Sequence, residues 1–164
     1  MPEVNKETQS QIISLVSDFV RRDVLPVVKD LEAKDIYPED LIDQMADLGL
    51  FGITIPQEYG GMGLDHTTFA MIFEELSKGW MSLTGPLGTH HVMASIISNF
   101  GTPSQKDTWL PKMASGDIRG GLGLTEPSGG SDIQSIQTKA VKNGNHYKIT
   151  GSKMFITNGD HGHA

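Results

Sequence analysis

The stretch Gly123–Ser135 reads GLTEPSGGSDIQS, and the stretch Lys153–Gly159 reads KMFITNG. In the first stretch, Pro127 and the pair Gly129-Gly130 are typical of a loop that exposes backbone N–H groups. Three nearby hydroxyls add further hydrogen-bonding groups: Thr125, Ser128 and Ser131. Such a loop can hold an anion or the polar edge of a ring, although a rigid turn with capping hydroxyls explains the same residues equally well.

The first stretch lacks both of the common nucleotide-binding patterns. Glu126 occupies the place of the third glycine in G-x-G-x-x-G, and no lysine stands at the phosphate-binding position of G-x-x-x-x-G-K-[ST]. The sequence therefore excludes a Rossmann-type loop and a P-loop here.

Charge and composition exclude several classes of protein. The 164 residues carry 13 Lys plus Arg against 20 Asp plus Glu, a net charge of -7 without a basic cluster, which argues against a nucleic-acid partner. The absence of cysteine excludes disulfides and Cys-ligated metal sites. A polar N-terminus and the lack of a membrane-spanning apolar run favour a cytoplasmic protein without a membrane span.

Hydrophobic spacing predicts a helical first part. From residue 6 to residue 31 apolar side chains recur every three or four positions, which predicts an amphipathic helix that Pro26 kinks. Start and stop signals predict four further helices: Pro38 to Gly49, Asp65 to Gly79, about 82 to 99, and Thr102 to Gly116.

After Asp117 the hydrophobic period changes from helical to alternating. Strands are expected in four runs: Leu122 to Leu124, Gln137 to Val141, His146 to Thr150, and Lys153 to Thr157. A turn is expected at Asn143-Gly144. These patterns predict an α+β protein with a domain boundary near Asp117.

The order of these patterns resembles the acyl-CoA dehydrogenase family. G-x-T-E-P-x-x-G-S-D is followed by an Asn-Gly hairpin, by Gly151-Ser152-Lys153, and by an aromatic residue before Ile156-Thr157-Asn158. The similarity also includes three earlier runs, so that it covers about residues 35–164: Tyr59 to Gly63, Glu74 to Leu76, and Gly101 to Gln105. It implies an N-terminal all-α domain at 1–117 and the first part of a β-barrel-like middle domain at 118–164, with the chain ending before the family's C-terminal helical bundle.

By this resemblance, FAD binds between the two stretches. Leu124 and Thr125 are expected to bond the polar edge of the flavin ring through their backbone and through the Thr125 hydroxyl. Ser131 is expected to reach the diphosphate and the CoA arm of the substrate. Phe155 stands where the family has an aromatic residue, often tryptophan, although its strand-like neighbours leave an ordinary strand residue as the alternative. The expected flavin contacts are Leu122, Gly123, Leu124, Thr125, Gly130, Ser131, Phe155, Ile156 and Thr157.

The resemblance also implies that the fourth helix lines an acyl pocket. Gly85 and Gly88 lie three residues apart, so they would share one helix face and leave room for a long or bulky acyl tail. A broken helix start without a ligand is the alternative, because glycine and proline both disfavour helix interiors. The expected substrate contacts are Thr84, Gly85, Gly88, Thr89, Val92 and Ser131.

No residue of this chain is expected to be the catalytic base. Glu126 is expected to shape its loop, and by resemblance the family's base is a glutamate beyond residue 164. His90 and His91 point about 100° apart on a helix and lack an acidic partner at helical spacing, so no metal site is expected there. They are expected on the helix surface or on a pocket wall.

The implied activity is FAD-dependent α,β-dehydrogenation of acyl-CoA thioesters in fatty-acid oxidation. Electron-transfer flavoprotein is the implied acceptor, and the full-length protein is expected to form a homo-oligomer. The 164-residue chain alone is expected to be inactive. Two alternatives remain: a non-catalytic fragment or partner subunit that binds flavin or acyl-CoA, and an acyl-CoA oxidase or another flavoprotein of the same fold.

Overall fold

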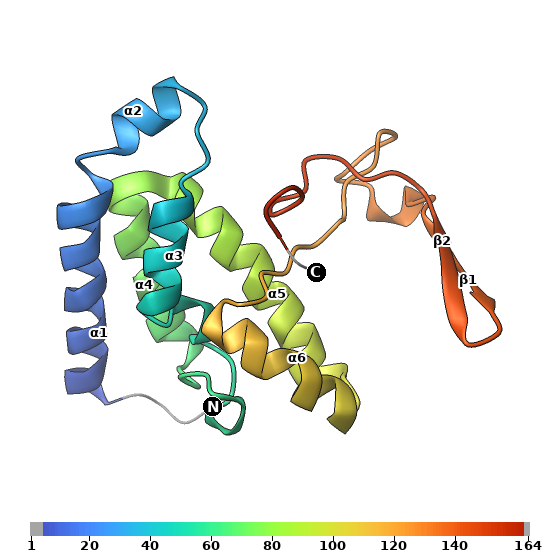
Figure 1. Ribbon diagram of the computed structural model, residues 1–164, viewed down its shortest axis with the longest axis horizontal. Helices are drawn as coiled ribbons and strands as arrows, with labels where there is room; N and C mark the ends of the chain where they lie inside the picture. The colour runs from blue at the N-terminus through green and yellow to red at the C-terminus, as the bar shows by residue number, and fades with distance from the viewer. Residues whose placement is uncertain (1–4, 163–164) are drawn as a thin grey trace.

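A computed structural model describes residues 5–162 (Figure 1). Helices fill the first part and a hairpin follows, in this order: α1 Lys6–Phe19, the π-helical turn η1 Val20–Val24, α2 Val28–Ala33, α3 Glu39–Asp47, η2 Leu50–Gly52, η3 Gln57–Tyr59, α4 His66–Trp80, η4 Met81–Leu83, α5 Thr84–Phe100, α6 Pro103–Ser115, η5 Ile133–Ser135, β1 Lys139–Asn143 and β2 His146–Thr150. The predicted α+β class is confirmed, and the exact domain boundary stays a prediction.

The first predicted helix is interrupted in the region of Pro26. Pro26 has no N–H to donate, and the break begins upstream of it, in the π-helical turn η1. There the backbone N–H of Leu25 reaches back five residues to the carbonyl of Val20, at 2.9 Å. The chain becomes helical again at Val28, so the predicted kink is a complete interruption between α1 and α2.

The other helix boundaries follow their capping residues. Asp65 accepts a hydrogen bond from the N–H of Thr68 at 2.8 Å, and Thr102 forms a reciprocal capping box with Gln105. Gly116 ends α6 with a φ of 84°, which suits glycine. Gly79 does not end α4, which continues to Trp80: a Cβ at Gly79 would lie 2.6 Å from Val20 Cγ1, so this glycine permits close packing against η1.

The core lies among the helices. Completely buried side chains come from nearly all of the helices. Most belong to one cluster that includes Ile42, Met45, Phe51, Ile72, Leu76 and Leu87, and a smaller cluster contains Leu110 and Met113 of α6. Helix α1 packs on α4, and α5 packs on α6. Among the described residues no helix is both long enough and apolar enough to cross a membrane.

Two of the four predicted strands form, and they form one antiparallel hairpin. Asn143 pairs with His146, so the loop is Gly144-Asn145, one residue later than predicted. Gly144 has a φ of 61°, in keeping with the preference of tight hairpin turns for glycine. The runs 122–124 and 153–157 are not strands, because the main-chain bond that joins them is a single one, from Met154 N–H to Thr125 O at 2.8 Å.

The hairpin stands apart from the helices. Figure 1 shows the helices on one side and β1 and β2 on the other, and the chain that connects α6 to β1, residues 116–138, first passes along α5. The first sequence stretch lies on this connecting chain, and the second stretch follows β2. Leu122, just before the first stretch, and Thr157 in the second stretch lie beside α5.

Candidate functional site

A cavity of about 880 Å³ lies beside α5. Side chains from the other helices and loops form part of its wall, among them Thr54, Ile55, Phe69 and Phe73, and Leu122 from the connecting chain closes another part. Five of the six expected substrate contacts line it: Thr84, Gly85, Gly88, Thr89 and Val92. Ser131 lies outside it, exposed on its loop. This volume is within the usual range of small-molecule sites.

Helix α5 is unbroken through its two glycines. Pro86 occupies the first turn, where its missing N–H is tolerated, so the alternative of a broken helix start is wrong. A Cβ at Gly85 would lie 3.6 Å from Thr157 Cγ2, and a Cβ at Gly88 would lie 3.7 Å from Phe73 Cε1. Both are ordinary contacts, so the backbone does not require glycine at either position.

The two sequence stretches meet in space. The bond between Met154 N–H and Thr125 O joins them at the main chain, and Lys153 Nζ donates to Leu124 O at 3.0 Å and to Glu126 Oε1 at 2.9 Å. A Cβ at Gly123 would lie 3.3 Å from Lys153 Cγ, so glycine lets the two chains approach. The structure thus brings together residues about thirty positions apart in the sequence.

Glu126 organises the loop of the first stretch. Its buried carboxylate accepts the backbone N–H groups of Gln137 at 2.8 Å and Thr138 at 2.9 Å, in addition to Lys153. Hydrogen bonds from Thr138, from Gln137 and from Lys153 lower the pKa of Glu126 to about 2. A carboxylate so stabilised in its ionised form is a poor proton acceptor, which agrees with its expected role in shaping the loop.

The first stretch presents hydrogen-bond donors that have no acceptor. Within residues 5–162, the backbone N–H groups of Leu122, Leu124 and Thr125 find no partner. The two leucine side chains are 40% and 41% exposed. A Cβ at Gly130 would lie 3.1 Å from Thr125 Oγ1, so this glycine leaves space beside the hydroxyl. These groups form an exposed apolar and donor-rich surface.

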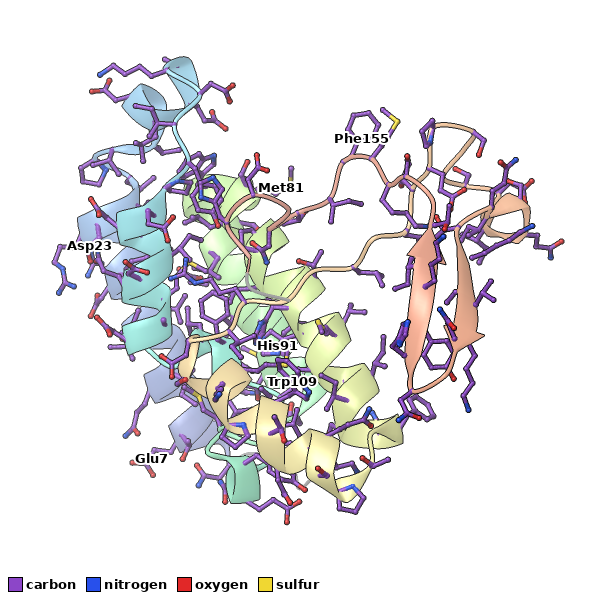
Figure 2. The ribbon with its side chains drawn as sticks, turned by 45° about the vertical axis from the view of Figure 1, so that its right-hand side comes forward. Glu7, Asp23, Met81, His91, Trp109 and Phe155 are labelled. Carbon is purple, nitrogen blue, oxygen red and sulfur yellow. The ribbon has the colours of Figure 1, made fainter. Side chains whose placement is uncertain are left out.

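Phe155 lies on an exposed bend of the second stretch. Its φ is 58° and its side chain is 87% exposed, so the alternative of an ordinary strand residue is wrong. Figure 2 shows Phe155 on the outer side of its loop, whereas His91 lies between the helices. Ile156 and Thr157, which follow it, are half-buried, and Thr157 faces Gly85.

Asn158 is a site residue that sequence analysis missed. Its side-chain Nδ2 donates to Gly120 O at 2.9 Å and to Pro86 O at 3.2 Å, and the side chain is buried. Its φ of 64° is left-handed, a conformation that asparagine tolerates better than most residues. The pair Asn158-Gly159 was the available signal, since this dipeptide is typical of such bends.

His90 holds Gly120 from the opposite side. Its Nδ1 accepts the Gly120 N–H at 3.3 Å, and its Nε2–H donates to Phe51 O at 3.1 Å, so the ring is neutral. Burial lowers the pKa of His90 to about 4. A place on the helix surface or on a pocket wall was expected for both histidines. For His90 this is wrong, because the ring is buried between α5, the η2 region and the connecting chain, whereas His91 lies on the wall of the cavity.

Arg119 adds an ionic anchor just before Gly120. The guanidinium is nearly buried and bonds the carboxylates of Glu39, at 2.7 Å, and Asp43, both on α3. Together with Gly120, this contact attaches the start of the connecting chain to the helices. Sequence reasoning missed it, because these partners are about eighty positions apart.

Comparisons with known proteins agree along the chain. The family model described as "Acyl-CoA dehydrogenase, N-terminal domain" matches residues 6–117, and "Acyl-CoA dehydrogenase, middle domain" matches residues 121–164. An acyl-CoA dehydrogenase of Bacillus subtilis is 39% identical over 93% of this chain and 41% of its own length. A (2S)-methylsuccinyl-CoA dehydrogenase of Cereibacter sphaeroides is 42% identical over 75% of this chain and 22% of its own length.

A solved structure shares the same arrangement. The glutaryl-coenzyme A dehydrogenase in complex with glutaryl-CoA superposes with a TM-score of 0.91 at 29% identity, covering 99% of this chain and 42% of that one. The chain therefore spans less than half the length of these similar proteins.

Proposed function

This chain belongs to the acyl-CoA dehydrogenase family, and on that premise we propose that it binds FAD and an acyl-CoA thioester for α,β-dehydrogenation of the acyl chain. This proposal rests on the contact between the expected flavin site and the cavity expected to hold the acyl chain. Leu122, an expected flavin contact, also lines the cavity, and Thr157 faces Gly85 on the cavity wall. A flavin on the two stretches would therefore border an acyl chain in the cavity.

The donor set of the first stretch fits a flavin. The unpartnered N–H groups of Leu124 and Thr125 suit acceptors on the polar edge of the ring, and the exposed leucines offer it an apolar surface. Ser131, exposed on the same loop, is proposed to reach the diphosphate and the CoA arm. The proposed contacts are the nine residues expected from the sequence: Leu122, Gly123, Leu124, Thr125, Gly130, Ser131, Phe155, Ile156 and Thr157.

The chain's own part in the reaction is binding and orientation. When bound, the flavin supplies the redox chemistry by accepting the hydride that leaves the β carbon. The wall formed by Phe69, Phe73 and α5 would exclude water from the acyl chain and direct the thioester toward the two stretches. Fixed anchors at Gly120 and Asn158 would hold those stretches in place during this alignment.

The described wall of the cavity offers no carboxylate as a proton acceptor. No Asp or Glu lies in the described wall, and Glu126 is committed to its loop. This observation favours a second candidate function, in which the 164-residue chain binds flavin and acyl-CoA without turnover. Electron-transfer flavoprotein as the acceptor, assembly into a homo-oligomer and a cytoplasmic location complete the proposal, on the family premise alone.

An anaerobic flavin titration tests both candidates. FAD is added to the purified chain, the visible spectrum is recorded, and hexanoyl-CoA is then added. A flavin band that shifts without bleaching supports binding without turnover, and bleaching supports dehydrogenation by this chain. Failure to bind FAD contradicts the proposal.

Two matched variants of the first loop give the titration a residue-level control. Thr125→Val removes the proposed hydroxyl contact and is expected to weaken FAD binding by about tenfold, which is the usual effect of losing one hydrogen bond to a ligand. Ser128→Ala, in the same loop but outside the proposed contacts, is expected to leave FAD affinity unchanged.

A further inference from the structure

The cavity contains polar side chains whose hydrogen-bonding groups are already used within its wall. The Thr54 hydroxyl bonds His91 Nδ1 at 3.0 Å, and His91 Nε2–H donates to Leu50 O at 2.9 Å. The other two threonine hydroxyls of the wall donate to main-chain carbonyls: Thr84 to Met81 O at 2.7 Å and Thr89 to Gly85 O at 3.2 Å. The donors of the three threonines and of His91 are therefore already committed, and a polar ligand group would have to displace these bonds. The other polar side chains of helix α5 in the wall, Ser95, Ser98 and Asn99, lie toward its C-terminal end and are half-buried or exposed to solvent.

The same wall carries no fixed positive charge. Within the described chain, none of its residues is Lys or Arg. His91 is neutral at pH 7, because burial lowers its pKa to about 4. His66 is exposed at the edge, where solvent screens a charge. The cations at the ends of the neighbouring segments are bound to carboxylates: Arg119 to Glu39 and Asp43, and Lys153 to Glu126.

A carboxylate moved from water into the buried part of this cavity loses its hydration and gains no charged partner. The free-energy cost of that transfer is large, whereas a hydrocarbon group of the same shape gains from burial. We therefore propose, on the premise that the cavity holds the acyl chain, that it accepts acyl groups with an uncharged hydrocarbon tail and rejects those ending in a second carboxylate. Two of the similar proteins are named for thioesters of dicarboxylic acids, so family membership alone does not decide this point.

A pair of isosteric thioesters tests the proposal. In glutaryl-CoA the tail ends in a carboxylate, and in 5-methylhexanoyl-CoA an isopropyl group of the same shape takes its place. Calorimetric titration of the FAD-loaded chain is expected to give an affinity about 100-fold weaker for glutaryl-CoA. A difference below tenfold, with both thioesters bound, overturns the proposal and leaves the proposed function standing. Absence of binding by either thioester contradicts the proposed function itself, and this inference with it.

A charge introduced on the wall provides the reverse test. Val92 lines the cavity and is partly exposed, so Val92→Arg can place a guanidinium there without burying it completely. This variant is expected to bind glutaryl-CoA at least tenfold more tightly than the unaltered chain, because the carboxylate gains a charged partner. Val92→Met, of similar length without charge, is expected to show no such gain. Equal affinities of the two variants for glutaryl-CoA, with FAD binding retained in both, overturn the proposal.

Discussion

The helical part and the chain that follows it are held in different ways. Within the described chain, every buried hydrophobic side chain lies between Val16 and Ala114. After that point the buried charged and polar side chains are Arg119, Glu126 and Asn158, and β1 and β2 are exposed along their whole length. The helical part thus has its own core, whereas the segment that carries both sequence stretches depends on a few polar contacts. Hydrophobic burial builds the cavity, and hydrogen bonds place the expected flavin surface beside it.

Low pH should lower the free energy of unfolding of the helical part, because its buried histidines are neutral in the folded state. His90 and His91 have pKa values of about 4 in the folded state, against about 6.5 in an unfolded chain. The unfolded state therefore binds more protons between these values, so their contribution is fully present above pH 6.5 and is lost as the pH falls toward 4. Between pH 7 and pH 4.5 the expected loss is about 5 kcal/mol for the two groups together. Urea unfolding followed by circular dichroism at pH 7, 5.5 and 4.5 measures it.

A double variant controls for other titrating groups. His90→Gln with His91→Gln removes both imidazoles, so its stability should vary much less over this pH range than that of the unaltered chain. An equally steep decline in the double variant would show that other groups cause the acid sensitivity.

Truncation of a buried leucine in the core should destabilise the helical part by about 3 kcal/mol. Leu76 is completely buried on α4, and Leu76→Ala removes buried methyl groups without compensation. Leu15→Ala on α1, where the side chain is half exposed, should cost less than about 1 kcal/mol. Urea midpoints for the two variants measure the difference, and similar midpoints would mean that the core is not where the structure places it.

Loss of the Asn158 side-chain bonds should detach the chain that follows the helical part, without changing the stability of the helical part itself. Asn158→Asp keeps the shape of the side chain but replaces the donating Nδ2 with a carboxylate oxygen that faces two carbonyls. The expected loss is about 2 kcal/mol in the free energy that holds this segment against the helices, which corresponds to a roughly 30-fold weaker FAD affinity. Asn143→Asp, on the exposed hairpin, makes the same change without the buried contacts.

Titration of the two aspartate variants with FAD measures this loss. If both variants bind FAD equally well, the side chain of Asn158 is not an anchor. The urea midpoint of the helical part should be the same in the two variants.

Gly88→Ala should have the smallest and opposite effect on stability. Alanine favours the helix by about 1 kcal/mol over glycine, and the new Cβ makes only an ordinary contact with Phe73. The methyl group also enters the cavity, so a bulky acyl tail should bind more weakly while FAD binding is kept. A more stable protein with unchanged preference among acyl-CoA lengths would show that the glycine does not provide room for the substrate.

Local signals predicted the helical part well. The capping residues Asp65 and Thr102 and the glycine at 116 mark helix ends through interactions within a few residues, so the sequence carries them directly. Gly79 was misplaced, because its contact with Val20 depends on how two helices pack.

The second region was predicted less completely. Its motifs were recognisable, and their adjacency was expected from family resemblance. However, Asn158, His90 and Arg119 act through partners thirty or more positions away, and periodicity does not reveal such pairs. The strands expected at 122–124 and 153–157 failed to form, because alternation indicates a strand only where a partner offers a ladder of bonds.

Hydrogen–deuterium exchange with and without FAD tests most directly whether the two stretches form one flavin site on the side of the helical cavity. FAD is predicted to slow exchange at residues 121–131 and 153–159 together, and to leave the core helices α3 and α4 unchanged. Protection of only one stretch, or protection confined to the helices, would contradict this account.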